Sequence, residues 1–282
     1  MGELATPDQG RFSWRVACGL AILVLTLTVM ALAQSGHDGS DPLANQIYSG
    51  GAFGYADRDG RQVLVPVDAG LARGMKGFCK AVATPGRVVP LTYAGVRRGG
   101  SGSDMAGFGD TSGAVFAAGG RVGPGGDVLV ATDDFLASRR VLGLTPLQDQ
   151  ECPAGLRQAL AARAGRPVVS CRDVATVDGG GVLALARFAS EDGRERLTLA
   201  YAGSDGLVCL DDPDAADFVA PWRPDADARF PEDGLRPLFA FRTGQGLELA
   251  VRRTGGELSC MELYRQDGDV FVPYVAASWP RP

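Results

Sequence analysis

Apolar and polar residues alternate along the chain in short runs on both sides of glycine-containing turns. Four segments share this pattern, over residues 53–67, 114–131, 182–201 and 238–251. A period of two places the apolar side chains on one face of a β-strand, and a short turn with Gly, often as Asp-Gly, favours a hairpin. We therefore predict four β-hairpins and a mainly β fold.

The last two hairpins continue in the same way, each into a further turn and a third strand that ends in cysteine. The first unit reaches Cys209 and the second reaches Cys260, about 51 residues later. Three-stranded meanders repeated at such a spacing are typical of propeller blades or of two packed sheets. The predicted fold is mainly β with two short helices, in a small propeller-like or sandwich arrangement. An α+β fold is the alternative.

The first short helix is predicted directly after the first hairpin. Asp68 can accept hydrogen bonds from the backbone N–H groups at the start of a helix. From Leu71 to Val82 the apolar residues recur at helical spacing and form one stripe, which includes Cys79. We therefore expect a helix through Val82, with Cys79 as a buried thiol.

The second short helix is predicted over residues 154–164. Pro153 suits the start of this helix, and Gly165 suits its end. Elsewhere glycine is frequent, with 40 in 282 residues, about twice the usual share. Many glycines without a strict period agree with many turns between short strands.

A strongly apolar segment, residues 16–33, precedes all these elements. It contains no charged residue and no proline. Arginines precede it, whereas Asp38 and Asp41 follow it and no further base occurs before Arg58. By the positive-inside rule this asymmetry keeps the leader, residues 1–15, in the cytoplasm and exports the rest of the chain.

Two interpretations of segment 16–33 stay open. Small residues at Ala31 and Ala33 fit a signal peptide cleaved after Ala33, whereas 18 apolar residues are enough for a retained transmembrane helix. In both cases we expect residues 34–51 to be a polar linker and residues 52–282 to be a single extracytoplasmic domain. That domain is periplasmic, or it is anchored to the membrane with its C-terminal part outside.

Export determines the expected chemistry of the cysteines, because disulfides persist in oxidising compartments. Cys152 and Cys171 flank the second helix, so a disulfide between them would close a helix-to-strand unit. Cys209 and Cys260 occupy matching places in the two meanders and form a second candidate pair if the meanders are neighbours. No cysteines have C-x-x-C spacing and the one histidine, His37, lies in the linker, so we predict no metal site.

The stretch 109–113 reads G-D-T-S-G and is close to the nucleophile motif of trypsin-like proteases. Ser112 is not predicted to be a nucleophile, because such a serine needs an imidazole held against it and His37 lies in a linker. The stretch also lacks the lysine of a phosphate-binding loop. We interpret it as a glycine-rich connection into the strand that begins at Ala114.

The first hairpin turn carries Asp57 and Asp59, which match the beginning of a calcium-binding loop. Such loops present several oxygen ligands and a closing acidic residue, and here the third ligand and the closing acid are missing. An aspartate in a hairpin turn needs no metal, since its side chain can accept hydrogen bonds from the backbone. We predict no cofactor.

An acidic, proline-rich stretch over residues 211–237 is the most distinctive candidate surface. Its candidate ligand-binding residues are Asp212, Asp217, Phe218 and Trp222, since acids beside an exposed aromatic ring suit a sugar, a cation or a basic partner. Paired carboxylates also serve glycoside hydrolysis. The alternative is a solvated connection held to the core by its aromatic residues.

The sequence favours an exported, non-catalytic envelope protein, a binding or structural module of unknown ligand. A carboxylate-dependent hydrolase, such as a glycosidase that uses acids of residues 211–233, is the alternative function. The net charge of −5, from 33 acidic and 28 basic residues, argues against a nucleic-acid partner. The expected partners are the membrane, through residues 16–33 if they are uncleaved, and a protein or glycan.

Intact-mass analysis of the chain recovered from envelope fractions tests the export prediction. We expect a chain that begins at Gln34 if the signal peptide is cleaved, or a full-length chain in the membrane fraction if it is retained. Recovery of the full-length chain from the cytosolic fraction, with its thiols reduced, would contradict export.

Overall fold

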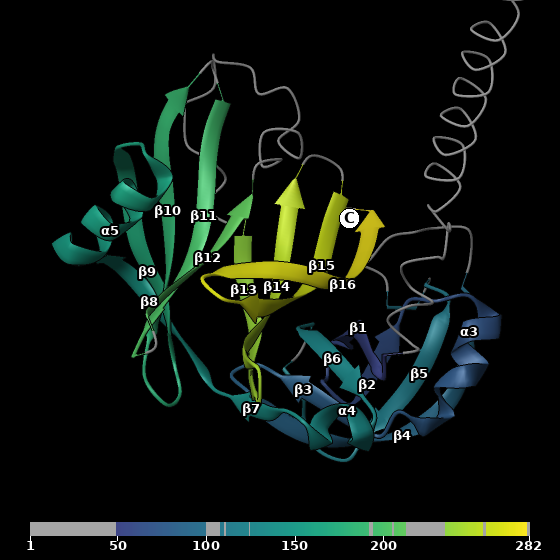
Figure 1. Ribbon diagram of the computed structural model, residues 1–282. Helices are drawn as coiled ribbons and strands as arrows, with labels where there is room; N and C mark the ends of the chain where they lie inside the picture. Colours follow the sequence, from purple (N-terminus) through teal and green to yellow (C-terminus); the bar gives the residue numbers. More distant parts are fainter. Residues whose placement is uncertain are drawn as a thin grey trace, which may run out of the picture. The chain divides into compact units, whose positions relative to one another are not determined.

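The strands of this protein form two sheets. The computed structural model describes residues 49–99, 108–109, 111–123, 125–191, 194–204, 206–212, 235–255 and 258–280. Within these ranges the chain is mainly β, as predicted, and carries three short α-helices (Figure 1). A closed six-stranded barrel and one ten-stranded sheet take the place of the expected propeller-like or sandwich arrangement. The described residues all belong to one compact unit.

The closed barrel is built from the first six strands, and each strand is antiparallel to its neighbours in the order β1-β2-β5-β4-β3-β6. The strands are β1 (Gly51–Ala56), β2 (Gln62–Val65), β3 (Lys80–Ala83), β4 (Arg87–Arg97), β5 (Gly113–Ala118) and β6 (Asp127–Ala131). Alternate side chains, such as Val63, Phe116 and Val130, fill the inside of the barrel. The side chains between them point outward, as period-two alternation requires.

The first two predicted hairpins have different outcomes. Strands β1 and β2 form the hairpin expected over residues 53–67, and in its turn the Asp57 carboxylate accepts hydrogen bonds from Arg61 N at 2.7 Å and Gln62 N at 3.1 Å. The hairpin expected over residues 114–131 is wrong. Strands β5 and β6 both exist, but β5 lies between β2 and β4 while β6 lies between β1 and β3.

The first helix is shorter than predicted. Helix α3 (Ala69–Gly74) begins after Asp68, whose Oδ1 accepts hydrogen bonds from Gly70 N at 2.6 Å and Leu71 N at 3.0 Å, so the predicted cap is confirmed. One 3₁₀ turn, η1 (Met75–Gly77), follows. Val82, expected in the helix, lies instead in β3, where it pairs with β4 and β6. Strand pairing on both sides outweighs a helical stripe that glycines already weaken.

Cys79 follows η1 and is a free thiol. We expected its side chain to be fully buried, but it is only half-buried.

The remaining strands form one sheet, in the order β7-β13-β14-β15-β16-β12-β11-β10-β9-β8. They are β7 (Arg140–Leu142), β8 (Leu144–Glu151), β9 (Val168–Val177), β10 (Val182–Glu191), β11 (Arg194–Gly203), β12 (Gly206–Asp212), β13 (Leu235–Thr243), β14 (Gly246–Gly255), β15 (Leu258–Asp267) and β16 (Val270–Pro280). The hairpins predicted over 182–201 and 238–251 are confirmed as β10–β11 and β13–β14. Each continues into the predicted third strand, β12 or β15.

The ten-stranded sheet curls around a core of its own. All ten strands contribute side chains to this core, among them Leu183, Leu199 and Leu249. Strands β7 and β8 follow each other in the chain with only Gly143 between them, yet they stand at opposite ends of the strand order, because β7 pairs with β13 and β8 pairs with β9. Residues 140–151 therefore connect the two ends of the sheet.

Helix α5 (Ala154–Ala164) covers the outer face of the meander β9–β12. It has the predicted bounds and ends at Gly165, whose φ of 65° is left-handed. Strands β10 and β11 present small residues to it, including Ala184 and Ala200, so that Leu160 of the helix packs closely on the sheet. Figure 1 shows α5 beside β9 and β10.

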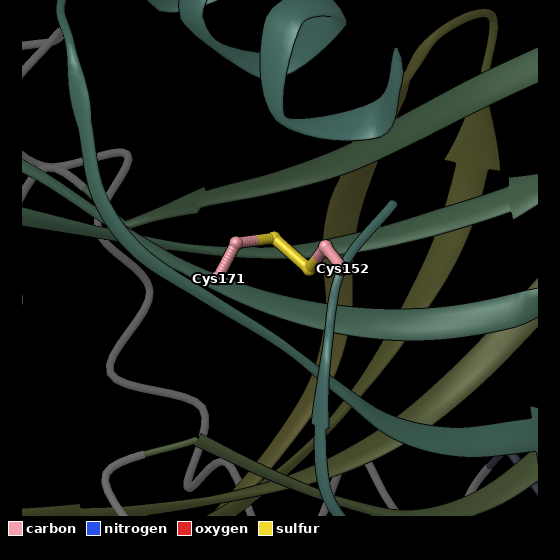
Figure 2. Close-up of a disulfide and its surroundings, with 2 residues drawn as sticks. All are labelled: Cys152 and Cys171. Carbon is pink, nitrogen blue, oxygen red and sulfur yellow. A yellow bond between two sulfur atoms is a disulfide. The ribbon is translucent and has the colours of Figure 1, made fainter. Parts of the chain in front are cut away.

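The predicted disulfide Cys152–Cys171 is confirmed. The two Cα atoms are 5.4 Å apart, and both side chains are buried under α5. Figure 2 shows the bond, which joins the chain just before α5 to strand β9. It holds both ends of the segment that contains the helix.

The other candidate disulfide, Cys209–Cys260, is wrong, because both residues are thiols. Strand β16 lies between β12 and β15. Cys209 lies beside Val270 of β16, whereas Cys260 pairs with Ser278, eight residues further along the same strand, which corresponds to about 26 Å. That separation is longer than the Cα–Cα distance of a disulfide. Burial raises the pKa of Cys209 to about 11, which keeps it a neutral thiol at physiological pH.

Removal of the disulfide should lower the free energy of unfolding. The two cysteines are 19 residues apart in the sequence, and closing a loop of that length stabilises a fold by about 3 kcal/mol. We expect the double variant Cys152→Ala/Cys171→Ala to lose about that amount in urea unfolding, whereas Cys79→Ala, at a half-buried free thiol, should change it little. Equal stabilities of the double variant and the wild type would contradict the structural role of the bond.

Candidate functional site

The barrel and the ten-stranded sheet share a hydrophobic contact. Phe53 and Leu129 point outward from the barrel and pack with Phe241 and Leu263 of the sheet. Helix α4 (Asp133–Ala137), which the sequence did not predict, adds Phe135, whose ring meets that of Phe241 edge to face at 6.1 Å. This contact fixes which barrel residues lie next to which sheet residues.

A partly buried polar network borders the hydrophobic contact. The Arg139 guanidinium binds both carboxylate oxygens of Glu248, at 2.7 and 3.3 Å, and lies over the Phe135 ring at 4.1 Å. The Tyr274 hydroxyl donates to the same carboxylate at 2.9 Å. Burial raises the pKa of Tyr274, and the negative charge of Glu248 raises it further, so the hydroxyl keeps its proton. Each group has a partner, so the network fits a structural role.

A pocket of about 400 Å³ lies where residues at one end of the barrel approach β14. We call it the polar pocket. Its lining comes from the end of β1, the β1–β2 turn, the pair 108–109, the start of β6 and strand β14. The charged and aromatic residues of this lining are Tyr55, Asp57, Arg58, Asp59, Phe108, Asp127 and Arg252.

An ion pair between Asp127 and Arg252 forms one wall of the polar pocket. Asp127 begins β6 of the barrel and Arg252 lies on β14, so the pair joins the two sheets. The Asp127 side chain is only 7% exposed. The Arg252 Nε atom is buried and has no hydrogen-bond partner in the part of the chain that the structure describes. Burial also lowers the pKa of Arg252, because the charged guanidinium loses part of its hydration in the folded protein.

Two aromatic rings form another wall. Tyr55 and Phe108 meet edge to face, with their centroids 5.8 Å apart. Arg97 holds Phe108 in place, because its guanidinium lies over that ring at 4.7 Å and donates to the Phe108 carbonyl at 2.5 Å. The Tyr55 hydroxyl is buried near the Thr111 hydroxyl, and within the described ranges neither oxygen has a hydrogen bond of ordinary geometry. Burial raises the pKa of Tyr55, although the Thr111 hydroxyl and Arg97 nearby act to lower it.

The ligand-binding residues predicted from the sequence are not tested by the structure. Asp212 is the last residue of β12, where its backbone pairs with Leu197. Asp217, Phe218 and Trp222 lie outside the described residues. The acidic-segment prediction, and with it the glycosidase alternative, therefore stays a prediction.

The other motifs of the sequence have structural roles at or near the polar pocket. The Asp57 carboxylate that suggested a calcium loop accepts hydrogen bonds from its own turn, and no metal-binding group of three or more His, Cys, Asp or Glu residues occurs within the described ranges. The Ser112 hydroxyl accepts a hydrogen bond from Gly99 N at 2.9 Å, in keeping with the connection expected there.

Segment 16–33 lies outside the described residues, and no helix among those that are described is long and apolar enough to cross a membrane.

Sequence reasoning missed the ion pair of the polar pocket. Asp127 and Arg252 are 125 residues apart, and no local pattern marks either residue as the partner of the other. One signal was present: the predicted strand 246–251 contains Glu248, and its continuation begins with Arg252 and Arg253. A charged residue in such a strand needs a partner when both faces of the strand are covered.

Comparisons with protein-family models, curated proteins and solved structures find no match to this chain. The chemistry of the polar pocket is therefore the basis for the function. The pocket combines hydrogen-bond donors on Arg252 and Tyr55 with carboxylate acceptors on Asp57, Asp59 and Asp127. This combination suits a ligand whose groups both donate and accept hydrogen bonds.

Replacement of Asp127 by asparagine should destabilise the protein. The variant removes the counter-ion of a partly buried guanidinium, which costs about 1–3 kcal/mol. Urea unfolding should show this loss for Asp127→Asn and almost none for Asp59→Asn, because Asp59 is exposed. The double variant Asp127→Leu/Arg252→Met should be more stable than Asp127→Asn, since apolar pairs often replace buried ion pairs without loss. Equal stability of Asp127→Asn and Asp59→Asn would contradict this account of the ion pair.

Proposed function

We propose that this protein is an exported, non-catalytic binding module of the cell envelope, and that its polar pocket holds a neutral sugar unit of a glycan. The observation that carries the proposal is the presence of two buried polar atoms without partners in one pocket, the Tyr55 hydroxyl and Arg252 Nε. A buried donor left without a partner costs about 1–3 kcal/mol. Both atoms are covered by neighbouring side chains, so a ligand that moves these side chains aside and accepts a hydrogen bond from either group would offset part of that cost.

The chemistry of the lining favours a sugar over other small ligands. Sugar hydroxyls accept hydrogen bonds from arginine and tyrosine and donate them to carboxylates. The partly exposed ring of Phe108 offers an apolar wall for the C–H groups of a sugar ring. The lining carries three carboxylates and two guanidinium groups, those of Arg58 and Arg252. Its net charge is therefore negative, and a polyanionic ligand would be repelled.

The assignment to the envelope has independent support. The buried disulfide Cys152–Cys171 agrees with folding in an oxidising compartment, because such bonds are rare in cytosolic proteins. The apolar segment 16–33 with its charge asymmetry remains the basis for proposing export. If that segment is retained, the membrane is a second partner and the polar pocket belongs to a tethered domain.

Glycan binding by pocket variants tests this function. The chain, recovered from envelope fractions in its mature form, is applied to an array of neutral, acidic and basic glycans, and the affinity of a bound glycan is then measured in solution. Tyr55→Phe removes only the unpartnered hydroxyl, so we expect binding to weaken about 3–10-fold, as loss of one hydrogen bond does. The melting temperature of the ligand-free chain should stay the same or rise, because a buried polar group without a partner is removed. Tyr93→Phe, in the barrel beside Phe116, should leave both quantities unchanged.

Two results would contradict the proposal. One is an array on which no glycan binds above background. The other is glycan binding that Tyr55→Phe leaves at wild-type affinity, because the sugar would then be bound outside the polar pocket.

A further inference from the structure

A second cavity, of about 200 Å³, lies at the seam where the ends of the ten-stranded sheet approach each other. We call it the seam cavity. Strand β8 contributes Leu144 and Pro146 on one side, and β13 contributes Leu235 and Pro237 on the other. Strands β9 and β10 supply the remaining apolar wall.

The pairing of the strands explains why the seam is open. Strand β13 pairs with β7 only from Ala240 to Arg242, so its earlier residues have no strand beside them on that side in the described sheet. Strand β8 is the last strand at the other end of the order. Pro146 and Pro237 cannot donate a backbone hydrogen bond, and the strand register shifts directly after each of them. Both edges are therefore poorly suited to pair with each other.

The side chains that line the seam cavity are mostly apolar, with the hydroxyl residue Thr84 from the β3–β4 turn of the barrel and one cation at the edge. Leu144, Ala175 and Leu185 line it and are also part of the core of the sheet. This apolar part of the lining can bury the methylene groups of an alkyl chain. Arg236 is the charged residue of the lining; it is exposed, and it makes no ion pair with the residues that the structure describes. No acidic side chain belongs to the lining.

We propose that the seam cavity binds a medium-chain fatty carboxylate, with its alkyl tail among Leu144, Ala175 and Leu185 and its carboxylate at Arg236. If a methylene group takes about the volume of a water molecule, ~30 Å³, a cavity of about 200 Å³ holds six or seven carbons of the tail. Each added methylene should raise the affinity about fourfold until the cavity is full. The site is separate from the polar pocket and does not depend on the function proposed for it.

Photolabelling of the purified full-length chain tests this site. The probe is an eight-carbon carboxylic acid that carries a diazirine on its alkyl chain. We expect crosslinks to map to the seam peptides 144–146, 174–185 and 235–238, and excess octanoate to compete with them. Val174→Trp fills the cavity from a half-exposed position and should reduce this labelling at least tenfold.

The carboxylate is tested separately with a matched alcohol probe. Arg236→Gln should reduce labelling by the carboxylate probe about two- to fivefold, as expected for one exposed ion pair, and leave labelling by the alcohol unchanged. Arg265→Gln removes another exposed strand arginine and should leave both unchanged. Equal loss in Arg236→Gln and Arg265→Gln, or no loss in either, would overturn the role of Arg236.

Two further outcomes would overturn the site itself. The first is labelling that maps mainly outside the seam peptides or that persists in a folded Val174→Trp variant. The second comes from Val174→Ala, which enlarges the cavity and tests the site even if the tryptophan variant fails to fold. Competition by acids of increasing length should peak at a longer chain in Val174→Ala than in the wild type, and an unchanged peak would contradict the proposal.

Discussion

The contact between the outer face of the barrel and the outer face of the meander β13–β16 determines how this protein is built. The side chains of a strand point alternately to its two faces. In these strands both faces are apolar, so one face packs in the core of its own sheet and the other must pack against another part of the protein. Phe53 and Leu129 supply that second face on the barrel, and Phe241 and Leu263 supply it on the sheet. Because the contact fixes β14 beside the start of β6, Arg252 meets Asp127, and the polar pocket is formed from both sheets.

Much of the local structure could be predicted from the sequence, but the long-range pairing could not. Turns with Asp-Gly or Gly-x-Gly identify β1–β2, β10–β11 and β13–β14, since a short turn leaves only one possible partner for each strand. The same alternation correctly predicted strands β5 and β6, but the prediction that they form a hairpin was wrong. Eight residues separate them, which is enough for each strand to pair elsewhere. In the closed barrel β5 lies between β2 and β4, and β6 lies between β1 and β3.

The cysteines show the same limit. Cys152 and Cys171 lie on either side of one helix, so their approach depends on a local unit that the sequence marks with Pro153 and Gly165. The approach of Cys209 to Cys260 would depend on strand order, and β16 comes between them. Both cavities depend on strand order too: the polar pocket needs an arginine 125 residues from its aspartate, and the seam cavity needs the two ends of one curled sheet. Local pattern can mark a charged residue in a strand, but it does not show which distant residues meet at either cavity.

We infer that the barrel and the ten-stranded sheet are stabilised by their shared contact and unfold together. Scanning calorimetry of the chain, with and without Phe241→Ala, tests this cooperativity, because Phe241 is fully buried in that contact. We expect one cooperative transition in the wild type, whose calorimetric and van't Hoff enthalpies agree. In the variant the whole transition should move to lower temperature, as loss of about 3–5 kcal/mol requires. Two separate transitions in the wild type, of which the substitution shifts only one, would contradict the account.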